Sequence, residues 1–336
     1  MRSLKQCLTD IKNSNNIAIF THSSPDADAL ASAVALKKLI KNNLQNSNKI
    51  IDLFFDTDEI SEINGAIIKG VAHNLERCNS YDLAIALDCA SLSRLGKYRT
   101  LFEQCKNKIN FDHHITNENF GDNNLILKTS STCEGLYLIA KNKNLFIPDD
   151  VCSLIYSGMI TDTNNLTQGT ITIQTLKIIT DFLERKINLD ALNEHFFKNN
   201  TKSKAFLLKK ALDSLKFYYH DRIAIMNLTK ENLTLCNATM DDTLGIVNHG
   251  IEIKGVDIAI LAIKQEDNYY VSLRSKNGID VSNLAHTLGG GGHSQVAAFV
   301  WNGNLAELLD KLLPLCKEEL QNHPQEKVED LFGGDC

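Results

Sequence analysis

Short apolar runs, each followed by an acidic or histidine residue, recur along the first half of the chain. Three of these runs cover residues 17–20, 83–87 and 109–111. Segments with helical spacing separate them, and the clearest covers residues 30–40. Because short buried runs alternating with helices are typical of a parallel sheet, each run predicts a strand. A looser run, residues 154–160, is interpreted as a fourth strand of the same kind.

The second half of the chain has a different pattern. Residues 223–226 and 256–263 predict sheet strands, and the region after Glu307 predicts a helix followed by a frayed Gly/Asp end. A segment rich in Lys, Asn, Leu and Phe lies between the halves and predicts a helical connector. At 336 residues, the chain is long enough for about two domains, each with its own core. The predicted fold is therefore α/β, with a parallel-sheet domain at residues 1–185, a helical linker at 186–215 and a smaller α/β domain at 216–336.

The balance of charge excludes one class of partner. The chain has 35 Lys and Arg residues against 41 Asp and Glu residues, a net charge of −6. A protein that coats long duplex nucleic acid needs an extensive basic surface, so we expect no partner of that kind. The charge still allows a short substrate, because metal ions and one or two arginines can neutralise its few phosphates.

Cysteine usage and hydropathy indicate the compartment. The nine cysteines are scattered without a C-x-x-C pair, so neither a thiolate zinc site nor a disulfide framework is expected. No apolar run approaches the roughly 18 residues of a membrane-spanning helix, and no apolar segment follows Met1-Arg2-Ser3. We therefore expect a soluble, cytoplasmic protein without a membrane partner.

Acidic and histidine residues follow the predicted strands. Ligands of parallel sheets gather outside the carboxyl ends of the strands, so these residues should converge on one edge of the sheet. The residues concerned are His22, Asp26, Asp28, Asp88, Asp112, His113, His114 and Asp162.

The mixture of carboxylates and imidazoles predicts a two-metal centre. Such ligands suit manganese, iron, cobalt or zinc better than magnesium, and manganese is the first choice. Two ions about 3.5–4 Å apart can share one carboxylate, generate a bridging hydroxide and hold phosphoryl oxygens for in-line attack. Asp88, alone at its strand end, is the natural shared ligand.

Each of these residues has a structural alternative. Asp26 or Asp28 could cap the helix that follows, and capping would be the better interpretation if either stood alone. Asp88 could be a turn residue, and Asp162 could accept local backbone hydrogen bonds. The paired histidines could lie on the surface. A coincidence of all four placements is much less expected than any single one, so the metal centre is favoured.

A run of four glycines, residues 289–292, predicts a ligand-binding loop in the second half. Without Cβ atoms its backbone N–H groups can approach a phosphate closely, and Arg274 can add a bidentate contact. A flexible linker is the alternative, but the apolar residues 296–300 follow at once, as expected of a loop before a buried strand. The run is neither a P-loop nor a dinucleotide fingerprint.

Four strings in the first half resemble the motifs of the DHH phosphoesterase superfamily. They are residues 22–32 (HSSPDADALAS), 87–89 (LDC), 112–114 (DHH) and 158–163 (GMITDT). A fifth piece resembles the substrate-binding DHHA1 domain of that superfamily, and it consists of residues 271–276 (VSLRSK), 280–282 (DVS) and 289–293 (GGGGH). Order and spacing both match, and the chain is most similar to the bifunctional nanoRNase and pAp phosphatase group.

The resemblance implies a role for each matching metal-site residue. One manganese ion would be held by His22, Asp26 and Asp88, and the other by Asp28, Asp88, His113 and Asp162. His114 would face the phosphate, and Asp112 would orient the histidines.

The resemblance also implies how substrate is held. Arg94 matches a family position and would contact substrate or the neighbouring subdomain. Substrate would lie in a cleft between the two domains, and the chain would be a homodimer. The matching residues of the second domain are Arg274, Ser275, Gly290, Gly291, Gly292 and His293.

The expected activity is metal-assisted hydrolysis of very short oligoribonucleotides, such as pApA or pGpG, with the 3′-phosphate of pAp as a second substrate. A cyclic-dinucleotide phosphodiesterase is the alternative within this class. A nucleotide-binding regulator that has lost catalysis is the alternative from another class. Three departures from the family pattern, at residues 164–166 (Asn-Asn-Leu), at Ser294 and at residues 297–299 (Ala-Ala-Phe), bear on the choice of substrate.

Overall fold

The computed structural model describes residues 4–44, 48–57 and 60–323. The chain divides into two compact units, Met1–Asn199 and Asn200–Cys336. The separate linker and the cleft between domains stay predictions. Within the described part of the chain, no helix has the length and apolar character needed to cross a membrane.

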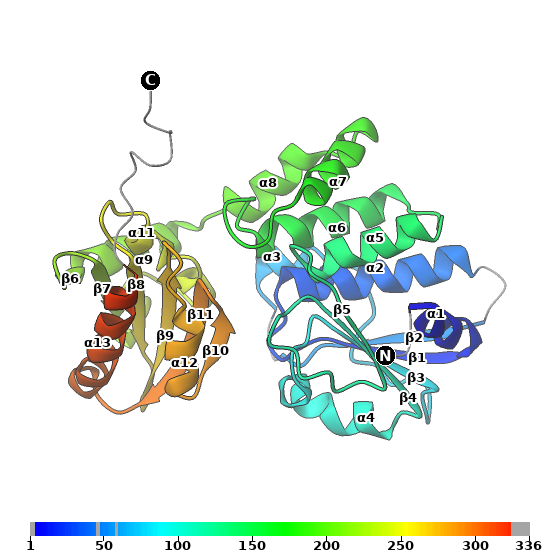
Figure 1. Ribbon diagram of the computed structural model, residues 1–336, viewed down its shortest axis with the longest axis horizontal. Coiled ribbons are helices and arrows are strands. Elements are labelled where there is room, and N and C mark those ends of the chain that lie inside the picture. The colour runs from blue at the N-terminus through cyan, green and yellow to red at the C-terminus, as the bar shows by residue number, and fades with distance from the viewer. Residues whose placement is uncertain (1–3, 45–47, 58–59, 324–336) are drawn as a thin grey trace. The chain divides into compact units, whose positions relative to one another are not determined.

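The first unit is built on a sheet of five parallel strands (Figure 1). The strands predicted from the apolar runs are confirmed, and β3 is buried along its whole length. In spatial order the strands are β2 (Ile50–Phe54), β1 (Asn16–Phe20), β3 (Leu83–Leu87), β4 (Asn107–Asp112) and β5 (Asn123–Ile126).

Helices cover both faces of this sheet, and Figure 1 shows α4 on the face opposite α2, α5 and α6. One face packs into a large core with α2, the other into a smaller core rich in Phe and Tyr. The helices of the first unit are α1 (Leu4–Asn13), α2 (Ala27–Asn43), α3 (Glu62–Gly65), η1 (Leu92–Tyr98), α4 (Arg99–Gln104), α5 (Thr132–Asn142), α6 (Asp149–Asp162), α7 (Ile173–Glu184) and α8 (Leu189–Phe197).

The fourth predicted strand is wrong, because residues 154–160 lie inside helix α6. This helix packs against α2, α5 and α8, so its residues from Ile155 to Ile160 are all buried. A helix buried on nearly every side loses the amphipathic period that distinguishes it from a buried strand.

The second unit has a six-stranded mixed sheet in which only β7 and β8 run parallel. The two strands predicted from the sequence are confirmed as β7 and β8. In spatial order the strands are β10 (Gly291–His293), β11 (Val296–Asn302), β9 (Asn268–Ser275), β8 (Ile258–Lys264), β7 (Ile223–Leu228) and β6 (Lys216–Tyr218).

Helices α12 and α13 contribute to the core on one face of this sheet, and α9 and α11 to the core on the other. The predicted C-terminal helix is confirmed and begins at Leu305, where Asn304 and Glu307 form a capping box. The predicted frayed end lies outside the described residues. The helices are α9 (Lys202–Asp213), α10 (Lys230–Leu235), η2 (Asp241–Thr243), α11 (Asn248–Ile251), α12 (Val281–Thr287) and α13 (Leu305–Asn322).

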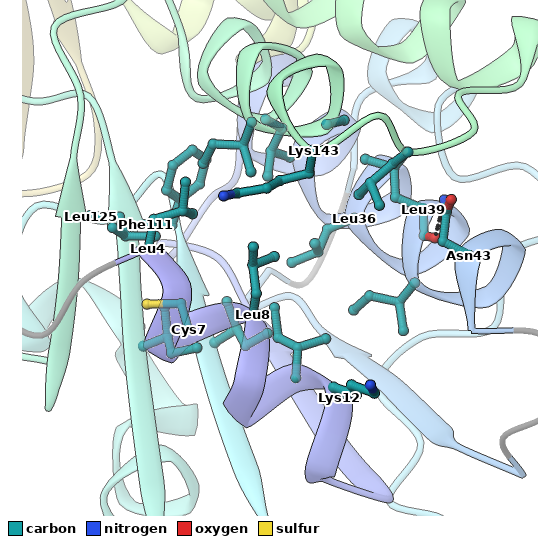
Figure 2. Close-up of a pocket in the computed structure, with 18 of the residues that line it drawn as sticks. Leu4, Cys7, Leu8, Lys12, Leu36, Leu39, Asn43, Phe111, Leu125 and Lys143 are labelled. Carbon is teal, nitrogen blue, oxygen red and sulfur yellow. Dashed lines mark hydrogen bonds between the residues drawn. The ribbon is translucent and has the colours of Figure 1, made fainter.

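A cavity of about 250 Å³ lies in the first unit among α1, α2, α5 and the sheet. Figure 2 shows the apolar side chains of Leu8, Leu36 and Phe111 around it, together with Lys12 and Lys143. None of the candidate metal ligands lines this cavity. It is therefore a feature of the packing of α1 on the core and is separate from the candidate site.

Candidate metal centre

The parallel sheet brings the predicted polar residues to one edge. His22 comes two residues after the end of β1, Asp88 directly follows β3, and Asp112 ends β4. Asp28 is in the first turn of α2 and Asp162 is the last residue of α6, and these two helices pack together. Asp162 therefore reaches the site from the end of a helix and not from the end of a strand.

A first group consists of His22, Asp26 and Asp88, with one ligand atom of each within 4.8 Å of the others. His22 Nε2 lies 3.8 Å from Asp26 Oδ2 and 3.8 Å from Asp88 Oδ2. The Nδ1 atom of His22 lies 2.8 Å from the carbonyl oxygen of Ser23, which places the proton on Nδ1 and leaves Nε2 as the ligand atom. Asp26 also caps α2 by accepting the N–H of Ala29, so the structural alternative and the metal role are compatible.

A second group consists of Asp28, His113 and Asp162, again with ligand atoms within 4.8 Å. His113 Nε2 lies 3.2 Å from Asp162 Oδ2 and 3.5 Å from Asp88 Oδ1. The two oxygens of Asp88 thus face different groups, Oδ2 toward His22 and Oδ1 toward His113. This is the arrangement that a carboxylate shared by two metal ions requires.

Asp112 holds His114 in place. Its Oδ1 lies 2.7 Å from His114 Nδ1 and accepts the backbone N–H of His113, and its Oδ2 accepts a hydrogen bond from Asn117 at 2.5 Å. The hydrogen bond and charge of His114 outweigh burial and lower the pKa of Asp112 to about 2. Because Nδ1 faces Asp112, any contact of His114 with a phosphate falls to Nε2. No pattern in the sequence singled out Asn117, which lies in the loop after the motif.

The N-terminus of α5 also reaches the centre, and this was missed from the sequence. The N–H groups of Thr132 and Cys133 donate to Asp28 Oδ2 and Oδ1 at 2.7 and 3.0 Å. The Thr132 hydroxyl donates to Asp88 Oδ1 at 3.0 Å. In the sequence, residues 129–132 look only like a helix cap, so nothing there signalled a contact with the site.

The centre carries excess negative charge. Burial, and then the charge of Asp88, raise the pKa of Asp28 to about 7. Burial, and then the charges of Asp28 and Asp88, raise the pKa of Asp162 well above its ordinary value. Burial lowers the pKa values of the nearby histidines, but neighbouring carboxylates outweigh it and raise them. Asp26 does so for His22, Asp88 and Asp28 for His113, and Asp112 and Asp88 for His114.

The donor set fits two divalent cations. Four carboxylates and two imidazoles converge, and within the described ranges none of these carboxylates forms an ion pair with Lys or Arg. Asp28 and Asp88 are buried, Asp162 is partly exposed and Asp26 is exposed. When deprotonated, the two buried carboxylates need positive charge from elsewhere. Divalent ions bound to oxygen and nitrogen ligands supply that charge.

Arg94 lies beside the first group. Its carbonyl oxygen accepts the backbone N–H of Ser23 at 2.6 Å, which ties η1 to the loop that carries His22. The side chain is exposed, and its positive charge acts to lower the pKa of His22. An exposed guanidinium next to a metal centre could meet a substrate phosphate, and that role stays a prediction.

In the second unit, Arg274 is held on β9 by two hydrogen bonds. Its Nε donates to Asn248 Oδ1 at 3.0 Å, and its Nη1 donates to the carbonyl oxygen of Leu273 at 2.9 Å. No carboxylate forms an ion pair with it in the part of the chain that the structure describes, and burial lowers its pKa. Ser275 is buried, and its hydroxyl donates to the carbonyl oxygen of Ile279 at 2.7 Å, so its side chain is engaged within the protein.

The glycine run is only partly a loop, because Gly291–His293 form strand β10 against β11. The glycines allow the two backbones to come close: a Cβ on Gly290 would lie 2.2 Å from the carbonyl oxygen of Ala298, and one on Gly292 would lie 2.3 Å from that of Val296. A Cβ on Gly291 would meet nothing within 4 Å. Packing therefore explains two of these glycines, and their predicted contact with substrate stays a prediction, as does that of His293.

The departure at residues 164–166 has a backbone explanation. Asn164, Asn165 and Leu166 have φ values of 45°, 58° and 63°, in the left-handed region. Asparagine is among the residues that tolerate this region best, so Asn164 and Asn165 fit the turn that follows Asp162. Ser294 is exposed and its carbonyl oxygen accepts the N–H of Val281.

Comparison with known families and structures agrees with this geometry. The family described as "DHH family, N-terminal domain" matches residues 16–159, and the DHHA1 domain matches residues 209–322. In fold, the chain is similar to an exopolyphosphatase-related protein from Bacteroides fragilis, with a TM-score of 0.81 and 23% identity over 95% of each chain. It is also similar to RecJ in complex with Mn²⁺ from Thermus thermophilus, with a TM-score of 0.52 and 13% identity over 95% of this chain and 53% of RecJ.

A curated relative narrows the group within the family. The probable bifunctional oligoribonuclease and PAP phosphatase NrnA of Streptococcus mutans is 27% identical over 299 residues, which cover 87% of this chain and 92% of the relative. Both domain matches occur in the order that the sequence motifs predicted. The chain therefore belongs to the DHH/DHHA1 phosphoesterase superfamily, and within it is most similar to the group of bifunctional oligoribonucleases and PAP phosphatases.

Proposed function

We propose that this protein is a two-metal phosphoesterase that hydrolyses very short oligoribonucleotides, with the 3′-phosphate of pAp as a second substrate. The observation that carries the proposal is Asp88, whose two oxygens face separate groups of candidate ligands. The activities for which the Streptococcus mutans relative is named, oligoribonuclease and PAP phosphatase, support the substrate class. The net charge of −6 supports a short substrate over a long one.

The ligands favour manganese, in agreement with the ion bound by the similar RecJ protein. When bound, two such ions supply a water of lowered pKa and neutralise charge on the phosphoryl oxygens. His22, Asp26 and Asp88 would hold one ion, and Asp28, Asp88, His113 and Asp162 the other. The protein contributes fixed geometry, because hydrogen bonds to Ser23 and Thr129 orient the ligand histidines.

One histidine and one arginine side chain would act on the substrate itself. His114, oriented by Asp112, would donate a hydrogen bond to a phosphoryl oxygen or to the leaving oxygen. Arg274 would bind the terminal phosphate, which supplies the counter-ion that its surroundings lack. Homodimerisation, which follows from the family resemblance, and a cytoplasmic location, which follows from cysteine usage and hydropathy, remain parts of the proposal.

A substrate panel tests the proposal. Mn²⁺-dependent turnover is measured on pApA, pGpG, pAp and cyclic di-AMP under the same conditions. We expect the highest kcat/KM for the linear dinucleotides, with measurable release of phosphate from pAp. Dominant turnover of cyclic di-AMP would replace this substrate assignment with a cyclic-dinucleotide phosphodiesterase. Absence of turnover with Mn²⁺, Mg²⁺, Co²⁺ or Zn²⁺ would contradict the phosphoesterase proposal.

Replacing Arg274 with Gln is expected to raise KM for pApA by about 10- to 150-fold, since a hydrogen bond to a charged group contributes about 1.5–3 kcal/mol. The effect should be much smaller for ApA, which lacks the 5′-phosphate. Steady-state kinetics on both substrates measure the difference. Lys209→Gln, which removes an exposed cation from α9 of the same unit, serves as the matched control and should leave both KM values unchanged. Equal losses on pApA and ApA would contradict a phosphate contact.

Mn²⁺ is expected to raise the melting temperature more at pH 7.5 than at pH 5. The pKa of Asp28 is raised to about 7 and those of the histidines are raised as well, so the folded metal-free protein binds protons more tightly than the unfolded chain. The contribution of these groups to stability is therefore greatest at low pH and is lost as pH rises through these values. Asp26 and Asp112, whose pKa values are lowered, act in the opposite direction only below about pH 4.

Metal ions bind the deprotonated ligands, so Mn²⁺ adds most stability at pH values where these ligands have lost their protons. Thermal unfolding in EDTA and in Mn²⁺ at the two pH values measures the effect. An equal increase in melting temperature at pH 5 and pH 7.5 would show that these groups do not bind the metal.

A further inference from the structure

Thr132, the first residue of α5, contacts carboxylates of both candidate groups. Its backbone N–H donates to Asp28 Oδ2 at 2.7 Å, and its hydroxyl donates to Asp88 Oδ1 at 3.0 Å. The residue is 1% exposed, so water does not compete for either contact. We propose that Thr132 is a positioning residue that fixes the orientation of the Asp88 carboxylate, an inference that rests on the proposed metal-dependent function.

The orientation of Asp88 decides whether both groups are complete. Rotation of the carboxylate about its Cβ–Cγ bond moves Oδ1 away from His113 and Oδ2 away from His22 together. The contacts of Oδ2 with His22 Nε2 and of Oδ1 with His113 Nε2 are 3.8 and 3.5 Å, so they do not themselves lock this rotation. An ionised carboxylate only accepts hydrogen bonds, so the Thr132 hydroxyl must be the donor. This bond is shorter than the contacts of the Asp88 oxygens with the ring nitrogens of His22, His113 and His114 at 3.8, 3.5 and 3.6 Å.

The backbone of Asp88 is held separately from its side chain. Its φ is 53°, in the left-handed region, which aspartate tolerates better than most residues other than glycine. Its N–H donates to the carbonyl oxygen of Phe111 at 3.0 Å, which fixes the main chain but leaves the side chain to rotate. A donor from another element is what holds the side chain in one rotamer.

Thr132 can serve as a fixed reference because the start of α5 is rigid. The Ser131 side chain caps the helix by accepting the N–H of Glu134 at 3.0 Å, and the Thr129 hydroxyl donates to the carbonyl oxygen of Ser131 at 2.8 Å. The N–H of Cys133 donates to the second oxygen of Asp28. One helix end thus sets the positions of Asp28 through its backbone and of Asp88 through a side chain. The spacing of the two groups follows from that single element.

The test compares variants that keep or lose the donor. Thr132→Val has nearly the same shape without a hydroxyl, and Thr132→Ser retains the hydroxyl. Titration of the metal-free proteins with Mn²⁺ by calorimetry, without substrate, is the main readout. We expect Thr132→Val to weaken Mn²⁺ binding by about 10- to 100-fold, in the range for residues that orient metal ligands, and Thr132→Ser to stay within about threefold of the unchanged protein.

A matched control separates positioning from packing. Thr175 is equally buried, and its hydroxyl donates to the Glu134 carboxylate at 3.1 Å and not to one of the candidate metal ligands. Thr175→Val should lower the melting temperature and leave Mn²⁺ affinity unchanged. If Thr132→Val does not fold, Thr132→Ala removes the same donor without a methyl group facing the carboxylate and replaces it in the titration.

The outcomes distinguish this inference from the proposed function. If the unchanged protein binds two Mn²⁺ ions and hydrolyses its substrate while Thr132→Val binds Mn²⁺ equally well, the positioning role is wrong and the function stands. A lower melting temperature of Thr132→Val without weaker Mn²⁺ binding likewise contradicts the positioning role. If the unchanged protein binds no metal ion, the proposed function itself fails.

Discussion

Asp88→Asn is expected to lower kcat/KM on pApA by about 10³-fold or more. Asparagine keeps the shape of the side chain but is neutral and offers one acceptor oxygen. It therefore cannot bind a metal ion in the first group, with His22, and another in the second group, with His113. Loss of one properly held ion removes several kcal/mol of stabilisation of phosphoryl charge, and about 4 kcal/mol corresponds to about 10³ in rate. Turnover on pApA and the number of Mn²⁺ ions bound, measured by calorimetry, give the result.

Asp267→Asn is the matched control, because Asp267 is an exposed aspartate between β8 and β9 of the second unit. It should leave both turnover and metal binding unchanged. A protein that regulates by binding nucleotides without catalysis would lose nothing in Asp88→Asn beyond metal binding and would keep its nucleotide affinity in EDTA. Substrate turnover by Asp88→Asn close to that of the unchanged protein would show that Asp88 is not the shared ligand.

The parallel sheet explains why so much of the centre is visible in the sequence. A strand of such a sheet ends at a fixed edge, so His22, Asp88 and Asp112 can be placed together from the positions of their apolar runs alone. The prediction that residues 154–160 form another strand failed because α6 is buried among three helices and lacks a polar face. Asp162 nevertheless reaches the same edge, since α6 ends there.

Contacts between distant segments could not be predicted in the same way. Thr132 and Asp28 are 104 positions apart in the chain, and only the packing of α5 beside α2 joins them. Asn248 likewise meets Arg274 only through the approach of α11 to β9. A threonine or asparagine at the start of a helix has a local explanation, so its sequence context conceals such a role.

The glycine run at residues 289–292 was visible in the sequence, but its contacts were not. Four in succession predicted a loop whose backbone approaches a ligand, and that contact stays a prediction. The close approach that the structure shows, at Gly290 and Gly292, is to β11 of the same protein. A run of glycines shows that a segment lacks side chains, but it does not show which group the backbone of that segment approaches. The same reasoning applies to Gly158, whose motif was visible while the reason for a glycine was not.

Gly158→Ala is expected to lower the melting temperature by several degrees and to weaken Mn²⁺ binding more than tenfold. Gly158 lies inside α6, where alanine would otherwise stabilise the helix by about 1 kcal/mol. A Cβ at this position would lie 2.4 Å from Asp28 Oδ1 and 2.5 Å from Cys133 Sγ. Overpacking of this kind costs about 1–3 kcal/mol, so the clash outweighs the gain in helix propensity.

The effect on metal binding depends on how the Asp28 carboxylate moves to make room for the added methyl group. Its carboxylate is held on one side by the N–H groups of Thr132 and Cys133, so a methyl group from α6 must displace it from these donors or push the helices apart. Either movement separates Asp28 from His113 and Asp162. Gly65→Ala in α3 is the control, because a Cβ there would meet nothing within 4 Å, and it should leave melting temperature and Mn²⁺ affinity nearly unchanged. If Gly158→Ala binds Mn²⁺ as tightly as the unchanged protein, then α6 can move away without displacing Asp28. The close packing of α6 on the Asp28 carboxylate would then not be required to complete the second group.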